Sequence, residues 1–164
     1  MCIYYISIIQ FPEDEAMPRI GKAFRELKVG DKLTERITVT ETHVVRAAGL
    51  FNDYNALHTN EPDMKSSRFG RRIVHGALTF SLVVGVYSKA FHDTDISTVE
   101  ASIKFTAPVF INDTITMEWT VTALDEKPKL NGGLVALSGE VRNTEEKVLA
   151  TLEAKILVGN ETVF

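Results

Sequence analysis

The sequence is short of cysteine, of basic charge and of long apolar runs. Its single cysteine, Cys2, has no disulfide partner within the chain, so no oxidising compartment is required and a reducing cytoplasm is the expected location. The formal net charge of -4 argues against a nucleic-acid partner, which usually meets a basic face. No apolar run reaches the ~20 residues that a bilayer span needs, so we expect no membrane partner.

The first residues, MCIYYISIIQF, are apolar but lack the basic start and the small-residue cleavage site of a signal peptide. Two interpretations stay open for them. They form an edge strand or a segment that packs on a partner, or they are an upstream extension before a natural start at Met17. We therefore expect residues 1–26 to form an N-terminal extension or arm. Residues 27–164 are expected to form one domain, since their number suits a single core.

Local patterns predict the elements of the first half of this domain. Residues 33–40 are rich in β-branched side chains and predict a strand. Thr40 or Thr42 can cap a helix of about three turns, whose apolar positions recur at helical spacing and which ends near Asn52. Residues 53–73 lack periodicity and contain proline and glycine, which predicts a loop with a short helical turn.

The second half combines one apolar helix with alternating strands. Residues 76–91 are apolar on nearly all sides, which is typical of a buried helix. Four alternating runs joined by turn signals follow, and they indicate an antiparallel meander with one buried face. The helix can lie against that face, so we expect an α+β fold in which a curved antiparallel sheet wraps around one central helix. The expected buried positions are Ile103, Phe105, Ala107, Val109, Ile115, Met117, Trp119, Val121, Val135, Leu137, Val141, Val148, Ala150, Leu152, Ala154, Ile156 and Val158.

Two motifs carry chemistry-bearing residues. The first is Asp53-Tyr54-Asn55-Ala56-Leu57-His58, and the second is Phe69-Gly70-Arg71-Arg72-Ile73-Val74-His75-Gly76. Together with the later Phe105-Thr106-Ala107-Pro108-Val109 and Asn112-Asp113-Thr114, they resemble the pattern of the MaoC-like hydratases of the hotdog fold. That family includes (R)-specific enoyl-CoA hydratases, and the resemblance covers about residues 27–158.

The chain departs from the family pattern at two positions. Asn52 replaces the usual glycine, and asparagine tolerates left-handed backbone angles better than most residues, so we expect it to serve there. Ala56 replaces the usual proline, which costs loop rigidity rather than a chemical group. Both changes leave the chemistry possible and bear on the preferred substrate.

The resemblance implies that Asp53 and His58 hold one water and add it across the double bond of a 2-enoyl thioester, or catalyse the reverse dehydration. A carboxylate and an imidazole suit this task because neighbours can tune both toward neutrality. Gly76 begins the buried helix, where an unpaired N–H can stabilise a developing oxyanion. Asn55 is expected to fix the loop or orient Asp53, and His75 to hold the loop at the helix start.

Plainer readings compete with these. An Asp-x-Asn run is often only a turn former, and a lone histidine is often structural. Basic residues of the loop could meet the phosphates of coenzyme A or form a solvated face, and this alternative stays open. They are Lys65, Arg68, Arg71 and Arg72. Neither a metal-ligand spacing nor a phosphate-cradling glycine loop is present, so we expect no metal and no cofactor beyond the coenzyme A of the substrate.

The expected function is that of a hydro-lyase acting on an enoyl-CoA or acyl-carrier thioester and yielding or consuming an (R)-3-hydroxyacyl group. The alternatives are a hotdog thioesterase and a non-catalytic acyl-CoA binding subunit. A single hotdog has an exposed sheet edge and a half-open pocket, so we also expect a homodimer or a higher homo-oligomer.

Overall fold

The computed structural model describes residues 21–163, and the structure of the protein below refers to these residues. The expectations for residues 1–20 lie outside the described part. The described part begins with a short 3-10 turn, η1, and contains four α-helices and five strands. In chain order they are η1 (Phe24–Glu26), β1 (Lys32–Thr38), α1 (Glu41–Phe51), α2 (Ala56–Thr59), α3 (Glu61–Lys65), α4 (Gly76–Ala90), β2 (Asp95–Phe105), β3 (Thr114–Lys127), η2 (Pro128–Leu130), β4 (Gly132–Arg142) and β5 (Val148–Gly159).

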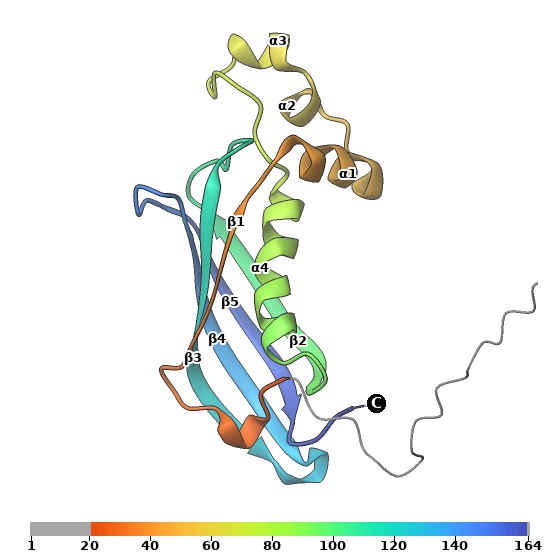
Figure 1. The fold of residues 1–164 in the computed structure, drawn as a ribbon, viewed down its shortest axis with the longest axis vertical. Coiled ribbons are helices and arrows are strands. Elements are labelled where there is room, and N and C mark those ends of the chain that lie inside the picture. The colour runs from red at the N-terminus through yellow and green to blue at the C-terminus, as the bar shows by residue number, and fades with distance from the viewer. Residues whose placement is uncertain (1–20, 164) are drawn as a thin grey trace, which may run out of the picture.

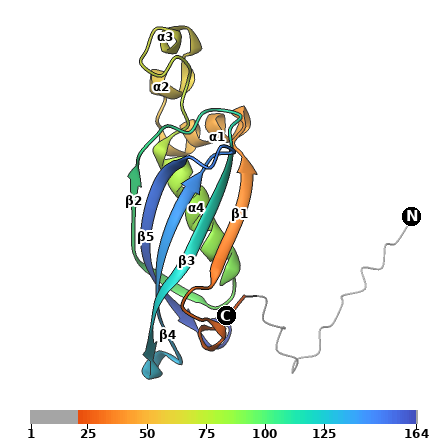
Figure 2. The same ribbon diagram turned by 90° about the vertical axis from the view of Figure 1, so that its left-hand side faces the viewer.

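The five strands form one antiparallel sheet that curves around α4 (Figure 1). Its strand order is β1-β3-β4-β5-β2, which Figure 2 shows from the face opposite the helix. The small helices α1, α2 and α3 gather at the end of the sheet where α4 begins. The predicted α+β fold, a curved sheet wrapped around a central helix, is therefore confirmed.

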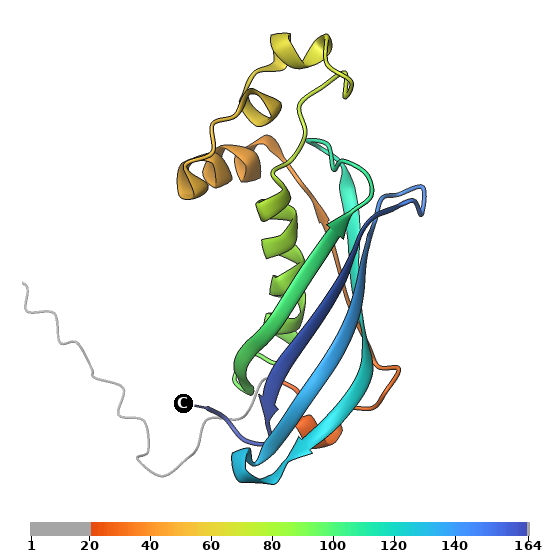
Figure 3. The ribbon, with the colours of Figure 1, turned by 180° about the vertical axis from the view of Figure 1, so that it is seen from behind.

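Two details of the predicted sheet are wrong. The strand expected to continue through Ala107 and Val109 starts earlier and ends at Phe105. This strand, β2, also pairs with β5 rather than with its successor β3, so only β3, β4 and β5 form a meander. Between β2 and β3 the chain crosses from one edge region of the sheet to the other (Figure 3). The alternation at Ala107 and Val109 has another cause: Val109 is buried beside the loop before α4, where its carbonyl accepts the Val74 N–H at 2.8 Å.

Packing between α4 and the sheet centres on Trp119. This side chain of β3 is fully buried, and its indole N–H donates to the Val83 carbonyl of α4 at 2.8 Å. The Tyr87 ring meets the indole edge-on at 5.5 Å between centroids, a favourable arrangement for aromatic pairs. Gly139 lies opposite Trp119 on β4, and a Cβ added there would come within 2.6 Å of the indole ring. The glycine therefore leaves the space that the indole needs.

Helix α4 is less completely enclosed than its composition suggests. Leu78, Val83, Val86 and Tyr87 are buried against the sheet, as expected. The opposite side is open in the single chain, however, and its apolar residues Phe80 and Val84 are only partly buried. Within residues 21–163, no helix is both long and apolar enough to cross a membrane.

Candidate active site

The candidate site lies where α1, α2 and the start of α4 meet. Helix α1 begins after Thr40, whose backbone N–H donates to His43 Nδ1 at 3.0 Å, and it ends with Asn52 at φ 53° and ψ 36°. The predicted left-handed conformation of Asn52 is thus confirmed. It turns the chain sharply, so that the Asp53 N–H donates to the Ala48 carbonyl at 3.1 Å. Asp53 is therefore held at a defined helix end rather than in a free loop.

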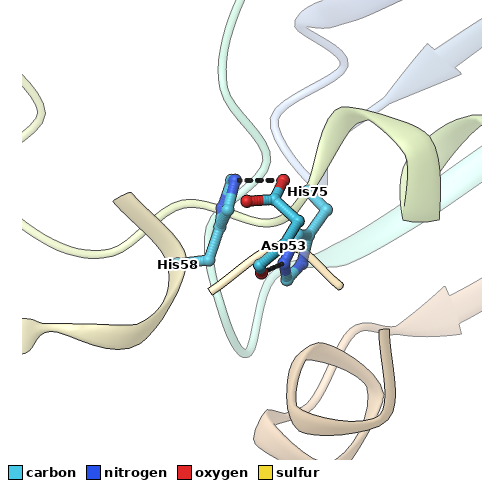
Figure 4. Close-up of side chains that lie close together, drawn as sticks. All are labelled: Asp53, His58 and His75. Atoms are coloured by element: carbon cyan, nitrogen blue, oxygen red, sulfur yellow. Dashed lines mark hydrogen bonds and ion pairs between the residues drawn. The ribbon is translucent and has the colours of Figure 1, made fainter. Parts of the chain in front are cut away.

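Three contacts fix the Asp53 residue. Its Oδ1 accepts the Asn55 backbone N–H at 3.2 Å, and its main-chain carbonyl accepts a hydrogen bond from His75 Nε2 at 3.0 Å. Its second carboxylate oxygen, Oδ2, faces His58 Nε2 at 3.7 Å (Figure 4). The side chain is 47% exposed, so solvent reaches the carboxylate group. The sequence motif therefore does bring the acid and the imidazole together.

The hydrogen bonds of His58 determine which ring nitrogen is available. Helix α2, which carries His58, is capped by the Asn55 side chain, which accepts the Leu57 N–H at 3.0 Å. The Nδ1 atom of His58 lies 2.8 Å from the Ile73 carbonyl oxygen. A carbonyl oxygen only accepts, so Nδ1 carries the proton and the neutral ring leaves Nε2 as an acceptor. Asp53 Oδ2 and His58 Nε2 are then two facing acceptors, and the two hydrogens of one water can satisfy both.

His75 supports both members of this pair. Its ring is buried and stacks on His58, with 3.8 Å between the centroids and 27° between the planes. Its Nε2 holds the Asp53 main chain, whereas its buried Nδ1 has no hydrogen-bond partner within the described residues. These contacts suit the expected role of His75 in holding the loop at the start of α4.

Asp53, His58 and His75 also bring three potential metal ligands within 4.8 Å of one another. Stacked imidazoles direct their lone pairs along nearly parallel planes rather than toward a common point. One nitrogen of each ring is moreover engaged with a backbone carbonyl. The three residues therefore form a poor chelating set for a single ion.

A cleft of about 360 Å³ opens beside the pair and has room for a small acyl group and its thioester. It is lined by His58, Phe69, Ile73, Val74, Gly76, Thr79, Phe105, Thr106, Ala107, Pro108 and Val109. Gly76 is the first residue of α4, and within residues 21–163 no hydrogen bond occupies its N–H. This amide is therefore open to a ligand in the cleft, where the helix end adds partial positive charge.

Phe105 is a site residue that sequence reasoning missed. Its half-exposed ring covers Gly76, and a Cβ added to the glycine would come within 3.1 Å of the ring. The alternating pattern around Phe105 predicts only a buried strand position for it. The signal that could have found it is the Phe-x-x-Pro-Val signature, because the four residues that follow Phe105 line the cleft as well.

The basic residues of the loop differ in how far they are engaged. Arg71 is half-exposed, lies over the Phe110 ring at 3.9 Å and makes only a long contact of 3.5 Å to Asp113. Arg72 is mostly buried and is bound to the carboxylates of Glu41 and Glu61 at 2.7 and 2.9 Å. The predicted solvated or phosphate-facing role therefore suits Arg71 and does not suit Arg72.

The sequence is similar to a known protein family and to several of its members. The family model described as MaoC like domain matches residues 26–142. Two (R)-specific enoyl-CoA hydratases are similar in sequence. The one from Rhodospirillum rubrum is 34% identical over 106 residues, which are 65% of this chain and 74% of that protein. The one from Aeromonas caviae is 33% identical over 127 residues, which are 71% of this chain and 93% of that protein.

Solved structures agree with these sequence matches. The (R)-hydratase from Aeromonas caviae superposes with a TM-score of 0.72 at 30% identity, over 80% of this chain and 97% of that one. A Mycobacterium tuberculosis protein described as a double hotdog fold superposes with a TM-score of 0.76 at 13% identity, over 88% of this chain and 46% of that one, which bears on the fold alone. The chain therefore belongs to the MaoC-like domain family and adopts the hotdog fold.

Proposed function

We propose that this protein adds water to the double bond of a 2-enoyl-CoA thioester to give an (R)-3-hydroxyacyl-CoA, and catalyses the reverse dehydration. The observation that carries the proposal is the pair of facing acceptors, Asp53 Oδ2 and His58 Nε2, 3.7 Å apart at the edge of a cleft that begins at Gly76. The activity of the named relatives from Rhodospirillum rubrum and Aeromonas caviae supports it.

The reaction uses each part of this geometry. A water held by Asp53 and His58 attacks C3 of the enoyl group, and the pair takes one of its protons as the C–O bond forms. The π electrons move toward the thioester, so negative charge develops on its oxygen. The Gly76 N–H can donate to that oxygen at the start of α4. The proton taken from the water then passes from the pair to C2 and completes the addition, and coenzyme A takes part only as a portion of the substrate.

Arg71 is our candidate for the phosphates of coenzyme A. Its side chain is 54% exposed, and its ion pair with Asp113 is long enough to be exchanged for a phosphate. Arginine suits this role because its planar donors match phosphate oxygens. The prediction concerns substrate affinity rather than the chemical step.

We further propose that the protein is a homodimer. Strand β2 is an edge of the sheet, and it exposes Val99 and Phe105. The partly buried Phe80 and Val84 lie on the open side of α4. A second copy can cover these apolar residues and pair the free strand edge. A mass measurement in solution that returns a stable monomer would contradict this proposal.

The test of the function is the loss of enoyl-thioester absorbance when purified protein is mixed with 2-enoyl-CoA esters of short, long and dicarboxylic acyl groups. We expect turnover with at least one ester and an (R) product in chiral analysis. Release of free thiol without loss of the double bond would instead indicate a thioesterase. Binding of the ester without any turnover would indicate a non-catalytic subunit.

A further inference from the structure

Arg72 is the most fully engaged cation near the candidate site. Its Nη1 and Nη2 atoms donate to the two carboxylate oxygens of Glu41 at 2.9 and 2.7 Å, and its Nε donates to Glu61 at 2.9 Å. A further hydrogen bond runs from Nη1 to the main-chain carbonyl of His58 at 3.3 Å. The side chain is 19% exposed.

The partners of Arg72 come from three different elements. Glu41 starts α1, the helix whose C-cap, Asn52, directly precedes Asp53. His58 lies in α2, and Glu61 starts α3. Arg72 therefore joins the helix that presents the carboxylate to the helix that presents the imidazole.

The main chain next to Arg72 strengthens this link. The Ile73 N–H donates to the Leu57 carbonyl at 2.9 Å, and the Ile73 carbonyl accepts the His58 Nδ1 proton at 2.8 Å. The position of residues 72 and 73 thus decides where the His58 ring stands and which of its nitrogens is free. Arg72 is thus linked to the His58 ring in two ways, through the His58 main chain and through the carbonyl of the neighbouring Ile73.

The charge around Arg72 does not favour an anionic ligand. One guanidinium faces two carboxylates, so the group as a whole carries an excess of negative charge. The hydrogen bond from Arg72 holds the pKa of Glu41 below its ordinary value, so this carboxylate stays ionised to a lower pH than a free glutamate. A phosphate would have to displace a carboxylate that is already well placed.

We infer that Arg72 is a positioning residue, which holds His58 at its distance from Asp53 by clamping α1, α2 and α3, and that it does not bind coenzyme A. The inference rests on the proposed hydration for its kinetic consequences. Its structural consequence, the fixed His58 ring, can be measured without turnover.

The kinetic experiment compares two substrates that share one enoyl group. One is the coenzyme A ester, and the other is the pantetheine ester, which lacks the nucleotide and its phosphates. For Arg72→Gln we expect kcat to fall about ten- to a hundredfold on both esters by the same factor, because a misplaced catalytic group slows the chemical step. Arg72→Lys keeps the charge but lacks the planar donors, and it should recover part of that loss.

Arg71→Gln and Arg142→Gln serve as matched controls. Arg71→Gln should raise KM for the coenzyme A ester and leave the pantetheine ester unchanged. Arg142 pairs with Glu140 within the same strand, so Arg142→Gln should leave kcat on both esters close to wild type. If Arg72→Gln only raises KM for the coenzyme A ester, the Arg72 side chain is a phosphate ligand and our inference is wrong.

A second readout separates positioning from general loss of stability. The His58 Nδ1 proton should give a slowly exchanging imidazole resonance in NMR spectra of histidine-labelled protein. In Arg72→Gln, below its melting temperature, this resonance should shift and exchange faster, while the ring resonances of His92, which lies outside the clamped helices, stay unchanged. An unaltered His58 resonance would overturn the inference. If the wild-type protein does not hydrate enoyl-CoA esters but Arg72→Gln still alters the His58 resonance, only the proposed function is refuted.

Discussion

Replacing Asp53 by asparagine tests the proposed water site most directly. The substitution keeps the size of the side chain and changes one acceptor oxygen into an amide. Because the Asn55 backbone N–H donates to Oδ1, the amide oxygen should take the Oδ1 position. The amide NH2 then takes the Oδ2 position, 3.7 Å from His58 Nε2. It would donate toward the very nitrogen that should accept from the water.

Two losses follow from this single change. The water loses its carboxylate acceptor, and the free nitrogen of His58 gains a competing donor. Removal of a positioned acid–base group typically costs 10²–10⁴ in rate, so we expect kcat/KM to fall by about 10³, which corresponds to about 4 kcal/mol. Folding should change little, because the Asp53 main-chain bonds to His75 and Ala48 remain.

The assay is the initial rate of enoyl-thioester absorbance loss, with Asp63→Asn as the matched control. Asp63 is a carboxylate of the neighbouring helix α3 that bonds to Asn60 and does not line the cleft. This control should stay within a few-fold of wild type. An Asp53→Asn enzyme within tenfold of wild type would remove Asp53 from the mechanism and refute the reasoning.

Three further substitutions probe the cleft and the core. Gly76→Ala should lower kcat/KM about tenfold, because the added methyl group would come within 3.1 Å of the Phe105 ring and must displace it. Adding Phe105→Ala to this variant should restore much of the rate. An unimpaired Gly76→Ala enzyme would contradict this prediction. Burial raises the pKa of the Asp95 carboxyl, so the folded state binds its proton more tightly than the unfolded state and loses stability as the pH rises through the raised pKa. Asp95→Asn should therefore raise the melting temperature at neutral pH and raise it much less in acid. A lower melting temperature at neutral pH would disprove this prediction. Trp119→Phe deletes the indole hydrogen bond to Val83 and should cost about 2 kcal/mol in urea unfolding, so an unchanged midpoint would show that this bond contributes little.

Local chemistry made several elements predictable from the sequence. The apolar run from Gly76 predicted α4, and helical spacing before Asn52 predicted α1. The proximity of Asp53 and His58 followed from the motif because both lie in a short segment whose caps are local, with Asn55 bonding both to the Asp53 carboxylate and to the start of α2. Interactions between near neighbours are readable in this way.

Long-range pairing was not predictable in the same way. Strand β2 could satisfy its hydrogen bonds at either edge, and its pairing with β5 depends on how the whole sheet closes around α4. The partners of Arg72 lie 31 and 11 residues away in sequence, on helices whose mutual position no pattern specifies. Arg72 lies among other basic residues in the sequence and therefore suggested a phosphate site, although the structure surrounds its side chain with the carboxylates of Glu41 and Glu61.

The indole of Trp119 has a consequence for how this scaffold can diversify. It ties the main chain of α4 to the sheet near the middle of the helix, so the helix is hindered from sliding or rotating to accommodate a bulkier guest. Adaptation to new acyl groups should then fall to the cleft walls that α4 does not form, at Phe69 and at residues 105–109, which a library aimed at altered chain length should vary first.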